Sequence, residues 1–595
     1  MRVFAVISAM LLTGTCALAQ TQNVFAPWLE DKSPQIAETL SVDQREGVEV
    51  TRLRFLSRVL PETGEKVLIY GVLARPLAPG KHPALLVCHG GSASADMVAS
   101  QTEAWAQRGY VAFCQDEPGI CDYTKTNSLG PWVRDGWSTF TPKIAGRIDT
   151  CSLFDGVVAA LNGLALLRSR PEVDTSRVGV WGGSWGGYMT TMISGLAGDR
   201  VRAAFAVYGC GFYELASTWR AALDRMPDAD RNLWLGNLDA GRRATGVRCA
   251  YFNCAASNDW FFWPEAVTKT LAQMPGYTNR VFSPNDSHVI TVPGGTAGPP
   301  KVDSRRNRTH METVWFAHYL DGTEKPFPKL TATDQARATD TGIEVNWTAE
   351  APVPFANVWA VYSPADVPAR FRLWKPVTAE KVAENHYRAV LPVEDSDVPI
   401  LWYGLATDER NVTVSTLIGT VDPRALAFNA SQATPDLLSE TFEGPFAKMR
   451  WRRPHVDRST GRGVIESAAA RTGSKGLHLT GPARWEMNGV RGEMLRKSAA
   501  RGVTLYVRSA NEKTVTGLKL VLVGEDEHGN RIEFICSRTA TIPLGPNWQQ
   551  VNALWTDFTV KDTPPIEMLG PRVGVLRLDV PEGVDLFVDD LALMP

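Results

Sequence analysis

The sequence has no excess of charge of either sign. Its 62 Lys and Arg residues are balanced by 64 Asp and Glu residues, which leaves a formal net charge of −2 over 595 residues. Proteins that bind nucleic acid usually concentrate positive charge in a patch or stripe, and the sequence contains no such run. The composition therefore argues against nucleic acid as a partner.

Long hydrophobic runs are missing beyond the first residues. Val3–Leu12 is almost entirely apolar, and it precedes the small-residue sequence Ala17-Leu18-Ala19. Such a run is too short to cross a bilayer but has the pattern of a secretory signal peptide. A lipid anchor on Cys16 is the alternative, which the bulkier Thr15 before it disfavours. We expect residues 1–19 to be a signal peptide, no membrane span, and a mature protein that is periplasmic or secreted.

Cysteine is scarce and lacks the spacing of a metal site. Eight cysteines follow the predicted signal peptide, with no C-x-x-C pair and no Cys/His spacing typical of zinc. Export permits disulfides. Pairings of Cys121 with Cys151, or of Cys210 with Cys254, are compatible with the sequence, which does not decide the pairing. The oligomeric state is likewise not readable.

The pattern of the chain changes at about residue 326. Before this point, short apolar runs alternate with helical stretches, which predicts an α/β domain over residues 20–326 with a parallel sheet and crossover helices. The predicted strands are Val67–Ala74, Ala84–Cys88, Val111–Cys114, Val178–Trp181, Ala203–Tyr208, Cys249–Cys254 and Arg280–Ser283, and two later helices are predicted at Pro264–Met274 and Thr309–Leu320.

Two all-β domains are predicted to follow. In residues 328–422, the segments Ile343–Trp347, Phe371–Trp374 and Leu401–Ala406 alternate as in a small sandwich of the Ig or fibronectin type. Residues 436–595 form the second domain. Its segments Thr441–Gly444, Trp548–Trp555 and Phe587–Leu591 resemble those of a galactose-binding-like jelly roll, the fold of many carbohydrate-binding modules. A sugar-binding role and a spacer role are equally compatible with this resemblance.

The strongest motif is Gly182-Gly183-Ser184-Trp185-Gly186-Gly187. It lies between an apolar strand and a helical stretch, the setting of the G-x-S-x-G nucleophile elbow of α/β hydrolases. Such a turn exposes the serine hydroxyl above the sheet, next to a helix N-terminus that favours negative charge. We therefore predict Ser184 as a nucleophile.

A nucleophilic serine needs donors for the oxyanion. His89-Gly90-Gly91 follows an earlier predicted strand, where α/β hydrolases place one such backbone N–H. We expect the N–H groups of Gly91 and Trp185 to form the oxyanion hole. His89 precedes the nucleophile in the chain, so it is interpreted as structural.

The remaining catalytic groups are expected in the order serine, acid, histidine. Asp259 and His288 each follow a predicted strand, at the sheet edge where catalytic groups collect. Competing residues fit less well: His310 and His318 fall on the closing helix, Asp224 and Asp228 come too early, and Asp286 lies too close in sequence to orient His288. The predicted triad is Ser184, His288 and Asp259.

Aromatic residues crowd the predicted site. Trp260-Phe261-Phe262-Trp263 follows the acid directly, and Trp132 and Trp137 lie in a long connecting segment. Flat indole rings can stack on a sugar or an aromatic acyl group, or they can simply exclude water. We expect Trp260 and Trp137 to contact substrate, and Phe261 and Phe262 to pack.

Residues 65–325 resemble the acetyl xylan esterase and dienelactone-hydrolase-like branch of the α/β hydrolases. The resemblance rests on His89-Gly90-Gly91, Gln115–Gly119, Leu166–Asp174, Gly183–Tyr188, Tyr208–Phe212 and Asn258-Asp259. It implies a serine carboxylesterase that needs no cofactor and deacylates a polysaccharide or oligosaccharide. The added β domains favour a glycan ester by analogy.

Other functions, and a structural metal site, are also compatible with the sequence. The elbow is shared with serine peptidases of the prolyl-oligopeptidase type, although these usually carry a large N-terminal propeller. A carboxylesterase for small or aromatic esters is a further alternative. Glu443 and Asp590 are weak candidates for a structural calcium site in the last domain, since calcium prefers oxygen ligands.

Overall fold

The computed structural model describes residues 23–132, 144, 146–215, 217–290, 292, 305–333, 335–433, 438–454, 459–526, 529–560 and 572–595. The predicted signal peptide and Trp137 lie outside these residues. In the described part, no helix is both long and apolar enough to cross a membrane.

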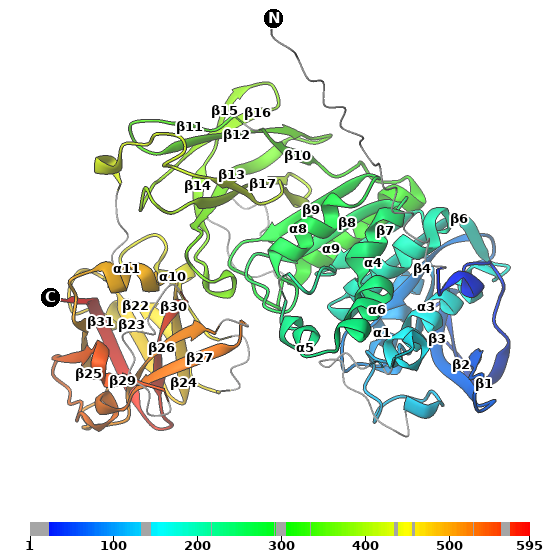
Figure 1. Ribbon diagram of the computed structural model, residues 1–595, viewed down its shortest axis with the longest axis horizontal. Coiled ribbons are helices and arrows are strands. Elements are labelled where there is room, and N and C mark those ends of the chain that lie inside the picture. Colours follow the sequence, from blue (N-terminus) through cyan, green and yellow to red (C-terminus); the bar gives the residue numbers. More distant parts are fainter. Residues whose placement is uncertain are drawn as a thin grey trace, which may run out of the picture.

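A nine-stranded sheet forms the first part of the molecule (Figure 1), in the order β1-β2-β3-β5-β4-β6-β7-β8-β9. Its strands are β1 (Ile36–Arg45), β2 (Val48–Val59), β3 (Lys66–Pro76), β4 (His82–Cys88), β5 (Val111–Gln115), β6 (Val173–Gly183), β7 (Ala203–Val207), β8 (Ala250–Ala256) and β9 (Thr278–Ser283). The helices of this part are α1 (Ala99–Gln107), α3 (Ser152–Arg168), α4 (Trp185–Ala197), α5 (Arg220–Asp224), α6 (Asp228–Leu238), α7 (Ala240–Arg243), α8 (Pro264–Ala272) and α9 (Arg305–Phe316).

The seven strands predicted from the sequence are all present. Strands β4 to β9 are parallel, as expected, but β3 pairs with β5 in the antiparallel direction. The hairpin of β1 and β2 was not predicted, because almost every residue of β1 is exposed and gives no apolar pattern. The parallel strands are buried along nearly their whole length, which explains why they were easy to recognise.

In the strand order, β5 lies on one side of β4 and β6 lies on the other, so the connecting helices lie on both faces of the sheet. The chain moves outward from β4 to β5 through α1, and back past β4 to β6 through α3. Right-handed crossovers then put α1 and α3 on opposite faces. Helix α4 packs beside α3, and the Trp105 ring of α1 contacts Phe316 of α9 at 5.5 Å between centroids. The parallel strands end together at one edge, where the loops after them carry the predicted site.

The middle β region, residues 329–421, contains two antiparallel sheets. One contains β10 (Lys329–Ala332), β11 (Arg337–Ala338), β12 (Ile343–Glu350), β15 (Glu380–Ala383) and β16 (His386–Leu391); the other contains β13 (Phe355–Pro364), β14 (Lys375–Thr378), β17 (Ile400–Asp408), β18 (Thr413–Ser415) and β19 (Gly419–Val421). The buried rings of Trp347 and Trp402 come from different sheets and lie 6.0 Å apart, so the two sheets share a core.

The prediction of a strand at Phe371–Trp374 was wrong. A 3₁₀ turn at Ala369–Phe371 precedes a stretch without regular structure, and β14 begins only at Lys375. All four residues from Phe371 to Trp374 are buried, which explains their apolar appearance in the sequence. These residues are buried because residues 367–374, here called the bridging segment, lie between the other parts of the molecule.

The C-terminal β region, residues 439–594, also consists of two antiparallel sheets. One contains β20 (Ser439–Glu440), β22 (Arg462–Glu466), β23 (Gly476–Thr480), β25 (Gly502–Ser509), β28 (Gln549–Leu554) and β31 (Asp585–Met594). The other contains β21 (Trp451–Arg452), β24 (Ala483–Asn488), β26 (Lys519–Glu525), β27 (Arg531–Cys536), β29 (Phe558–Thr559) and β30 (Val573–Val580), and two short helices are α10 (Ala447–Arg450) and α11 (Gly492–Lys497). One apolar cluster joins both sheets.

The structure also shows the surroundings of the cysteines and of the two candidate calcium ligands. The eight cysteines from Cys88 to Cys536 are buried thiols, so neither suggested disulfide is formed. The two candidate calcium ligands bind the loop at residues 472–475: Glu443 accepts hydrogen bonds from the Ser474 and Lys475 N–H groups, and Asp590 accepts one from the Thr472 hydroxyl. No group of three metal-ligating side chains occurs among the described residues.

Candidate active site

Ser184 lies on a sharp turn between β6 and α4. Its backbone has φ 59° and ψ −122°, a strained conformation for a residue with a side chain. The turn needs glycine after it, because a Cβ on Gly186 would lie 2.1 Å from the Cys88 carbonyl oxygen. A Cβ on Gly187 would lie 2.4 Å from the Val207 carbonyl oxygen. The tight packing of the elbow between β4 and β7 therefore explains the sequence motif.

The structure brings Ser184, His288 and Asp259 together from three separate loops. The Ser184 Oγ lies 2.9 Å from His288 Nε2, and His288 Nδ1 lies 3.1 and 3.2 Å from the two Asp259 carboxylate oxygens. With Nδ1 protonated, the ring donates to the carboxylate and accepts from the serine hydroxyl. Asp259 is fully buried, whereas 15% of the His288 side chain is exposed. Serine, base and orienting acid thus have the geometry of a catalytic triad.

Aromatic rings surround the imidazole of His288. Tyr208 stacks on it with 4.3 Å between ring centroids, and Phe261 meets it edge-on at 4.7 Å. Phe262 is stacked farther out, at 5.9 Å. Tyr208 holds this position at φ 72°, a second strained residue at the site. Tyr208 was not predicted as a site residue, because a tyrosine at the end of a strand usually belongs only to the core.

The glycine-rich loop after β4 lies directly against the elbow. A Cβ on Gly90 would be 3.7 Å from the Ser184 Cβ, and a Cβ on Gly91 would be 2.7 Å from Cδ1 of the Trp185 ring. The backbone of Gly91 and that of Trp185 therefore flank the serine. That their N–H groups form the oxyanion hole stays a prediction.

The histidines and acids that competed with the predicted triad have other partners. His89 is buried; its Nε2 accepts from the Glu117 N–H at 3.1 Å and its Nδ1 donates to the Gly90 carbonyl at 2.9 Å. Burial lowers the pKa of His89, which fits a neutral structural ring. His310 and His318 contact the carbonyl oxygens of Arg410 and Glu324. Asp286 accepts from the Ser283 hydroxyl at 2.6 Å.

The bridging segment holds both loops that carry the acid and the histidine. Asn258, next to Asp259, donates its side-chain amide to the carbonyl oxygens of Ala369 and Arg372 at 3.2 and 2.7 Å. Asn285, three residues before His288, bonds the backbone of Trp374. The sequence did not predict these contacts, because they join positions about 90 to 110 residues apart.

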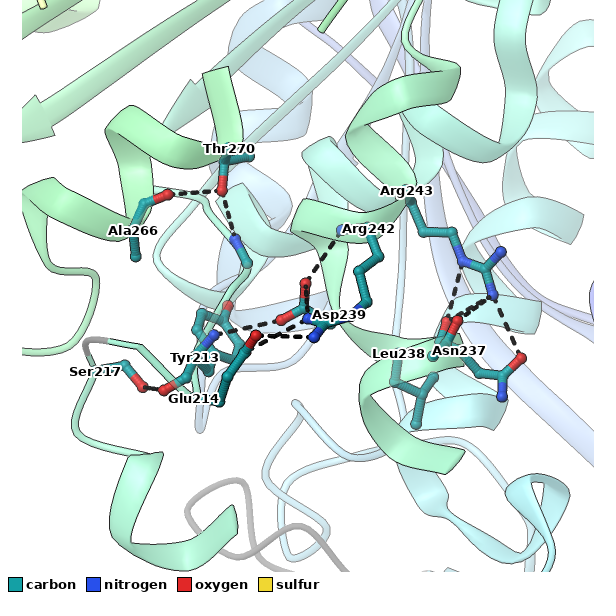
Figure 2. A network of polar contacts seen from close by, with 12 residues as sticks. Tyr213, Glu214, Ser217, Asn237, Leu238, Asp239, Arg242, Arg243, Ala266 and Thr270 are labelled. Carbon is teal, nitrogen blue, oxygen red and sulfur yellow. Dashed lines mark hydrogen bonds and ion pairs between the residues drawn. The ribbon is translucent and has the colours of Figure 1, made fainter. Parts of the chain in front are cut away.

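A polar network supports the other wall of the site, formed by residues 211–243 (Figure 2). Buried Asp239 accepts hydrogen bonds from the N–H groups of Tyr213 and Arg242, and Arg242 pairs with Glu214 at 2.8 Å. Tyr213 in turn packs against the Trp185 ring with 6.3 Å between centroids. Burial raises the pKa of Asp239 to about 6, against the opposing effect of Arg242. The network therefore fixes the position of the aromatic wall beside Ser184.

The tryptophans singled out in the sequence lie in different surroundings. Trp260 is partly exposed and lines a large cavity beside the acid and histidine loops. Trp132 is only 5% exposed and belongs to the core. Trp137 lies outside the described residues, so its role stays a prediction.

The strand order, the elbow and the convergence of serine, histidine and aspartate define a serine hydrolase of the α/β-hydrolase type. Residues 157–226, which include the elbow, match the model of the prolyl oligopeptidase family.

Solved structures with similarity to the chain include both esterases and a peptidase. The chain is similar to acetyl xylan esterase 1 from a Thermoanaerobacterium species, with 18% identity over 50% of this chain and 92% of that one and a TM-score of 0.40. It is similar to an acetyl xylan esterase from a Paenibacillus species, with 17% identity over 44% of this chain and 87% of that one and a TM-score of 0.35. It is also similar to dipeptidyl peptidase 4 from Porphyromonas gingivalis, with 17% identity over 45% of this chain and 35% of that one and a TM-score of 0.30.

Proposed function

We propose that the protein is an exported carboxylesterase that removes acetyl or related acyl groups from a polysaccharide or oligosaccharide. The observation that carries the esterase proposal is the hydrogen-bonded chain from Ser184 through His288 to buried Asp259. Export rests on the signal-peptide pattern of residues 1–19.

The geometry of the triad supports the following mechanism. His288 Nε2 accepts the proton of the Ser184 hydroxyl as the oxygen attacks the ester carbonyl carbon, and Asp259 stabilises the imidazolium that forms. The N–H groups of Gly91 and Trp185 stabilise the negative charge on the carbonyl oxygen. As the intermediate collapses and the bond to the sugar oxygen breaks, His288 passes the proton to that oxygen, which leaves as a hydroxyl group. In the second half, it deprotonates a water molecule that attacks the acyl-enzyme, releases the acid and restores Ser184.

The two β regions support a polymeric substrate. We infer that the middle β region is a sandwich of the Ig or fibronectin type and that the C-terminal β region is a jelly roll of the galactose-binding type. Each consists of two antiparallel sheets that share a core, which suits these architectures. Such modules commonly accompany enzymes that act on polysaccharides, so the glycan proposal rests on analogy.

The test is release of acetate from acetylated glycans and hydrolysis of p-nitrophenyl acetate. Ser184→Ala is expected to lose at least about 10⁴-fold in kcat, because the nucleophile is removed. The exposed Ser431→Ala, on a turn far along the chain, is the matched control and keeps full activity. Turnover that survives Ser184→Ala would contradict the mechanism.

The second candidate function is a serine peptidase of the prolyl-oligopeptidase type, favoured by the family match over residues 157–226. The third is a carboxylesterase for small or aromatic esters. Cleavage of a proline-containing peptide without release of acetate from any glycan would establish the second. Turnover of p-nitrophenyl or feruloyl esters without release of acid from any polymer would establish the third.

A further inference from the structure

A cavity of about 640 Å³ lies where the three parts of the molecule meet. One wall is formed by the loops after β8 and β9. The bridging segment forms a second wall with Arg370 and Phe371, and the C-terminal β region forms a third around β21 and β24. The cavity is therefore built by all three parts and does not exist in the α/β part alone.

The cavity lies next to the triad. Asn258 and Trp260, which line it, flank Asp259 in the chain, and Ser287 and Val289, which also line it, flank His288. We therefore expect the part of a large substrate beyond its acyl group to extend from Ser184 toward this cavity.

Positive charge predominates in the lining. The lining contains two acidic side chains, Asp286 and Glu486. It contains five cationic side chains, which are Arg370, Lys448, Arg452, Arg453 and Arg531. Arg370 pairs with Glu525 and Arg531 pairs with Glu486. These two pairs leave three cations. Arg453 donates to the Gly461 carbonyl outside the cavity lining, and the charges of Arg452 and Lys448 remain to be explained.

Arg452 is a largely buried cation whose hydrogen bonds go to neutral oxygens. Its guanidinium donates to the Asn285 carbonyl and, at 3.0 Å, to the Asn488 side chain. Burial lowers the pKa of Arg452, although the nearby carboxylates of Glu486 and Asp286 act in the opposite direction, so these two acids do not fully offset the cost of desolvating the guanidinium. Lys448 is exposed at the cavity, and no described carboxylate lies within ion-pair distance of it. Both cations would be stabilised by an anionic ligand.

Indole rings complete the site. Trp260 and Trp485 are both partly exposed and line the cavity, and the Trp485 ring covers Gly463, where a Cβ would lie 2.5 Å from it. Flat aromatic faces suit the apolar faces of sugar rings. A ligand with a ring and an acidic group matches this combination.

We propose that the cavity binds an anionic sugar residue of the substrate chain, with its carboxylate or sulfate at Arg452 and Lys448 and its ring against Trp260 and Trp485. The inference rests on the proposed function, because the bound sugar belongs to the same chain as the ester. The substrate is then an acidic glycan, held beside the residue whose acyl group is removed.

The test is calorimetric titration of the full-length Ser184→Ala protein with three oligosaccharides of equal length. They are a neutral xylo-oligosaccharide, one that bears glucuronic acid, and a sulfated galacto-oligosaccharide. At least one acidic probe is expected to bind about tenfold more tightly than the neutral one, since hydrogen bonds to charged groups are the stronger kind. Preference for one acidic probe distinguishes carboxylate from sulfate.

Charge reversal locates the site. Lys448→Glu is expected to weaken binding of the acidic probe about tenfold and to leave the neutral probe unchanged. Lys513→Glu, at an exposed lysine of the same β region that is not in the cavity, is the matched control and leaves both unchanged. Equal binding of acidic and neutral probes, or an equal effect of the two substitutions, overturns the proposal.

Hydrolysis of p-nitrophenyl acetate by the wild-type protein separates this inference from the proposed function. If that ester is hydrolysed and acidic probes bind no better than neutral ones, the cavity proposal fails and the esterase stands. If acidic probes bind and neither this ester nor any acetylated glycan is hydrolysed, the esterase proposal fails.

Discussion

The side chain of Asn285 pairs with the backbone of Trp374 through two hydrogen bonds. Its amide nitrogen donates to the Trp374 carbonyl at 2.9 Å, and its carbonyl oxygen accepts from the Trp374 N–H at 2.8 Å. Asn285 has φ 62°, a left-handed conformation that asparagine tolerates better than most residues. These two hydrogen bonds fix the histidine loop to the middle β region in the same way that a pair of backbone hydrogen bonds joins two antiparallel strands.

Asn285→Ala should reduce catalysis through the position of His288. The substitution leaves two backbone groups of Trp374 without partners and costs about 2–4 kcal/mol of stability. We expect kcat for p-nitrophenyl acetate to fall about 10- to 100-fold, with KM nearly unchanged, because a small displacement of the base affects the transition state most. Steady-state kinetics and urea unfolding measure the two effects.

Asn385→Ala is the matched control, since Asn385 is exposed and has a similar φ of 59°. It shares the backbone strain but not the contact, so its kcat should stay at the wild-type value. A destabilised Asn285→Ala protein with normal kcat would show that the contact is structural only.

Tyr208 is expected to position the imidazole through ring stacking. Tyr208→Phe keeps the ring and should retain kcat within about threefold, whereas Tyr208→Ala should lose about tenfold or more, in the range of aromatic pair energies. The measurement is kcat for a small ester, together with the urea midpoint.

Tyr208→Gly separates the ring from the backbone, because glycine relieves the strain at φ 72°. We expect the glycine protein to be more stable than the alanine protein and equally slow. Recovery of kcat in the glycine protein would instead assign the effect to backbone strain.

Gly91→Ala should impair the oxyanion hole. The new Cβ would lie 2.7 Å from the Trp185 ring, so the loop or the indole must move. Loss of one oxyanion donor typically costs about 10²- to 10³-fold in kcat. Gly236→Ala, on α6, meets nothing within 4 Å and should leave kcat unchanged. Unaltered kcat in Gly91→Ala would remove this loop from the mechanism.

Asp239 should give the protein a pH-dependent stability. Its pKa is raised from 3.8 to about 6, so the folded state holds its proton more tightly than the unfolded state does. The resulting stabilisation is complete below pH 4 and is lost as the pH rises to about 6, by at most about 3 kcal/mol.

Asp239→Asn removes this titration, and its free energy of unfolding should fall less between pH 4 and pH 6 than that of the wild type. Asp155, with a pKa also raised to about 6, titrates in both proteins and cancels in the difference. Urea unfolding at several pH values gives the comparison. Parallel profiles would mean that Asp239 is already ionised throughout this range.

The α/β part was readable from the sequence because its strands are buried on both faces. Continuous apolar runs such as Ala84–Cys88 and Ala203–Val207 need no partner to be recognised. The elbow was readable because close backbone approach forces glycine at Gly186 and Gly187. Chain order then pointed to Asp259 and His288, which the structure brings together with Ser184.

Contacts between the three parts of the molecule could not be predicted from the sequence. Phe371 and Leu373 look like inward residues of a strand, yet Phe371 packs with Val521, Val523 and Val575 of the C-terminal β region. Burial at an interface and burial in a strand leave the same apolar signature. Asn285 gave no signal either, since an asparagine in a loop is common.

The bridging segment makes the catalytic unit larger than the α/β fold. A fragment ending near residue 326 would keep Ser184, His288 and Asp259 but lose the backbone acceptors of Asn258 and Asn285. Its acid and histidine loops would then lack the hydrogen bonds that fix them to the bridging segment. For protein engineering, this means that the hydrolase cannot be treated as a detachable module, and that grafting it onto another binding domain requires carrying residues 367–374 and their supports along.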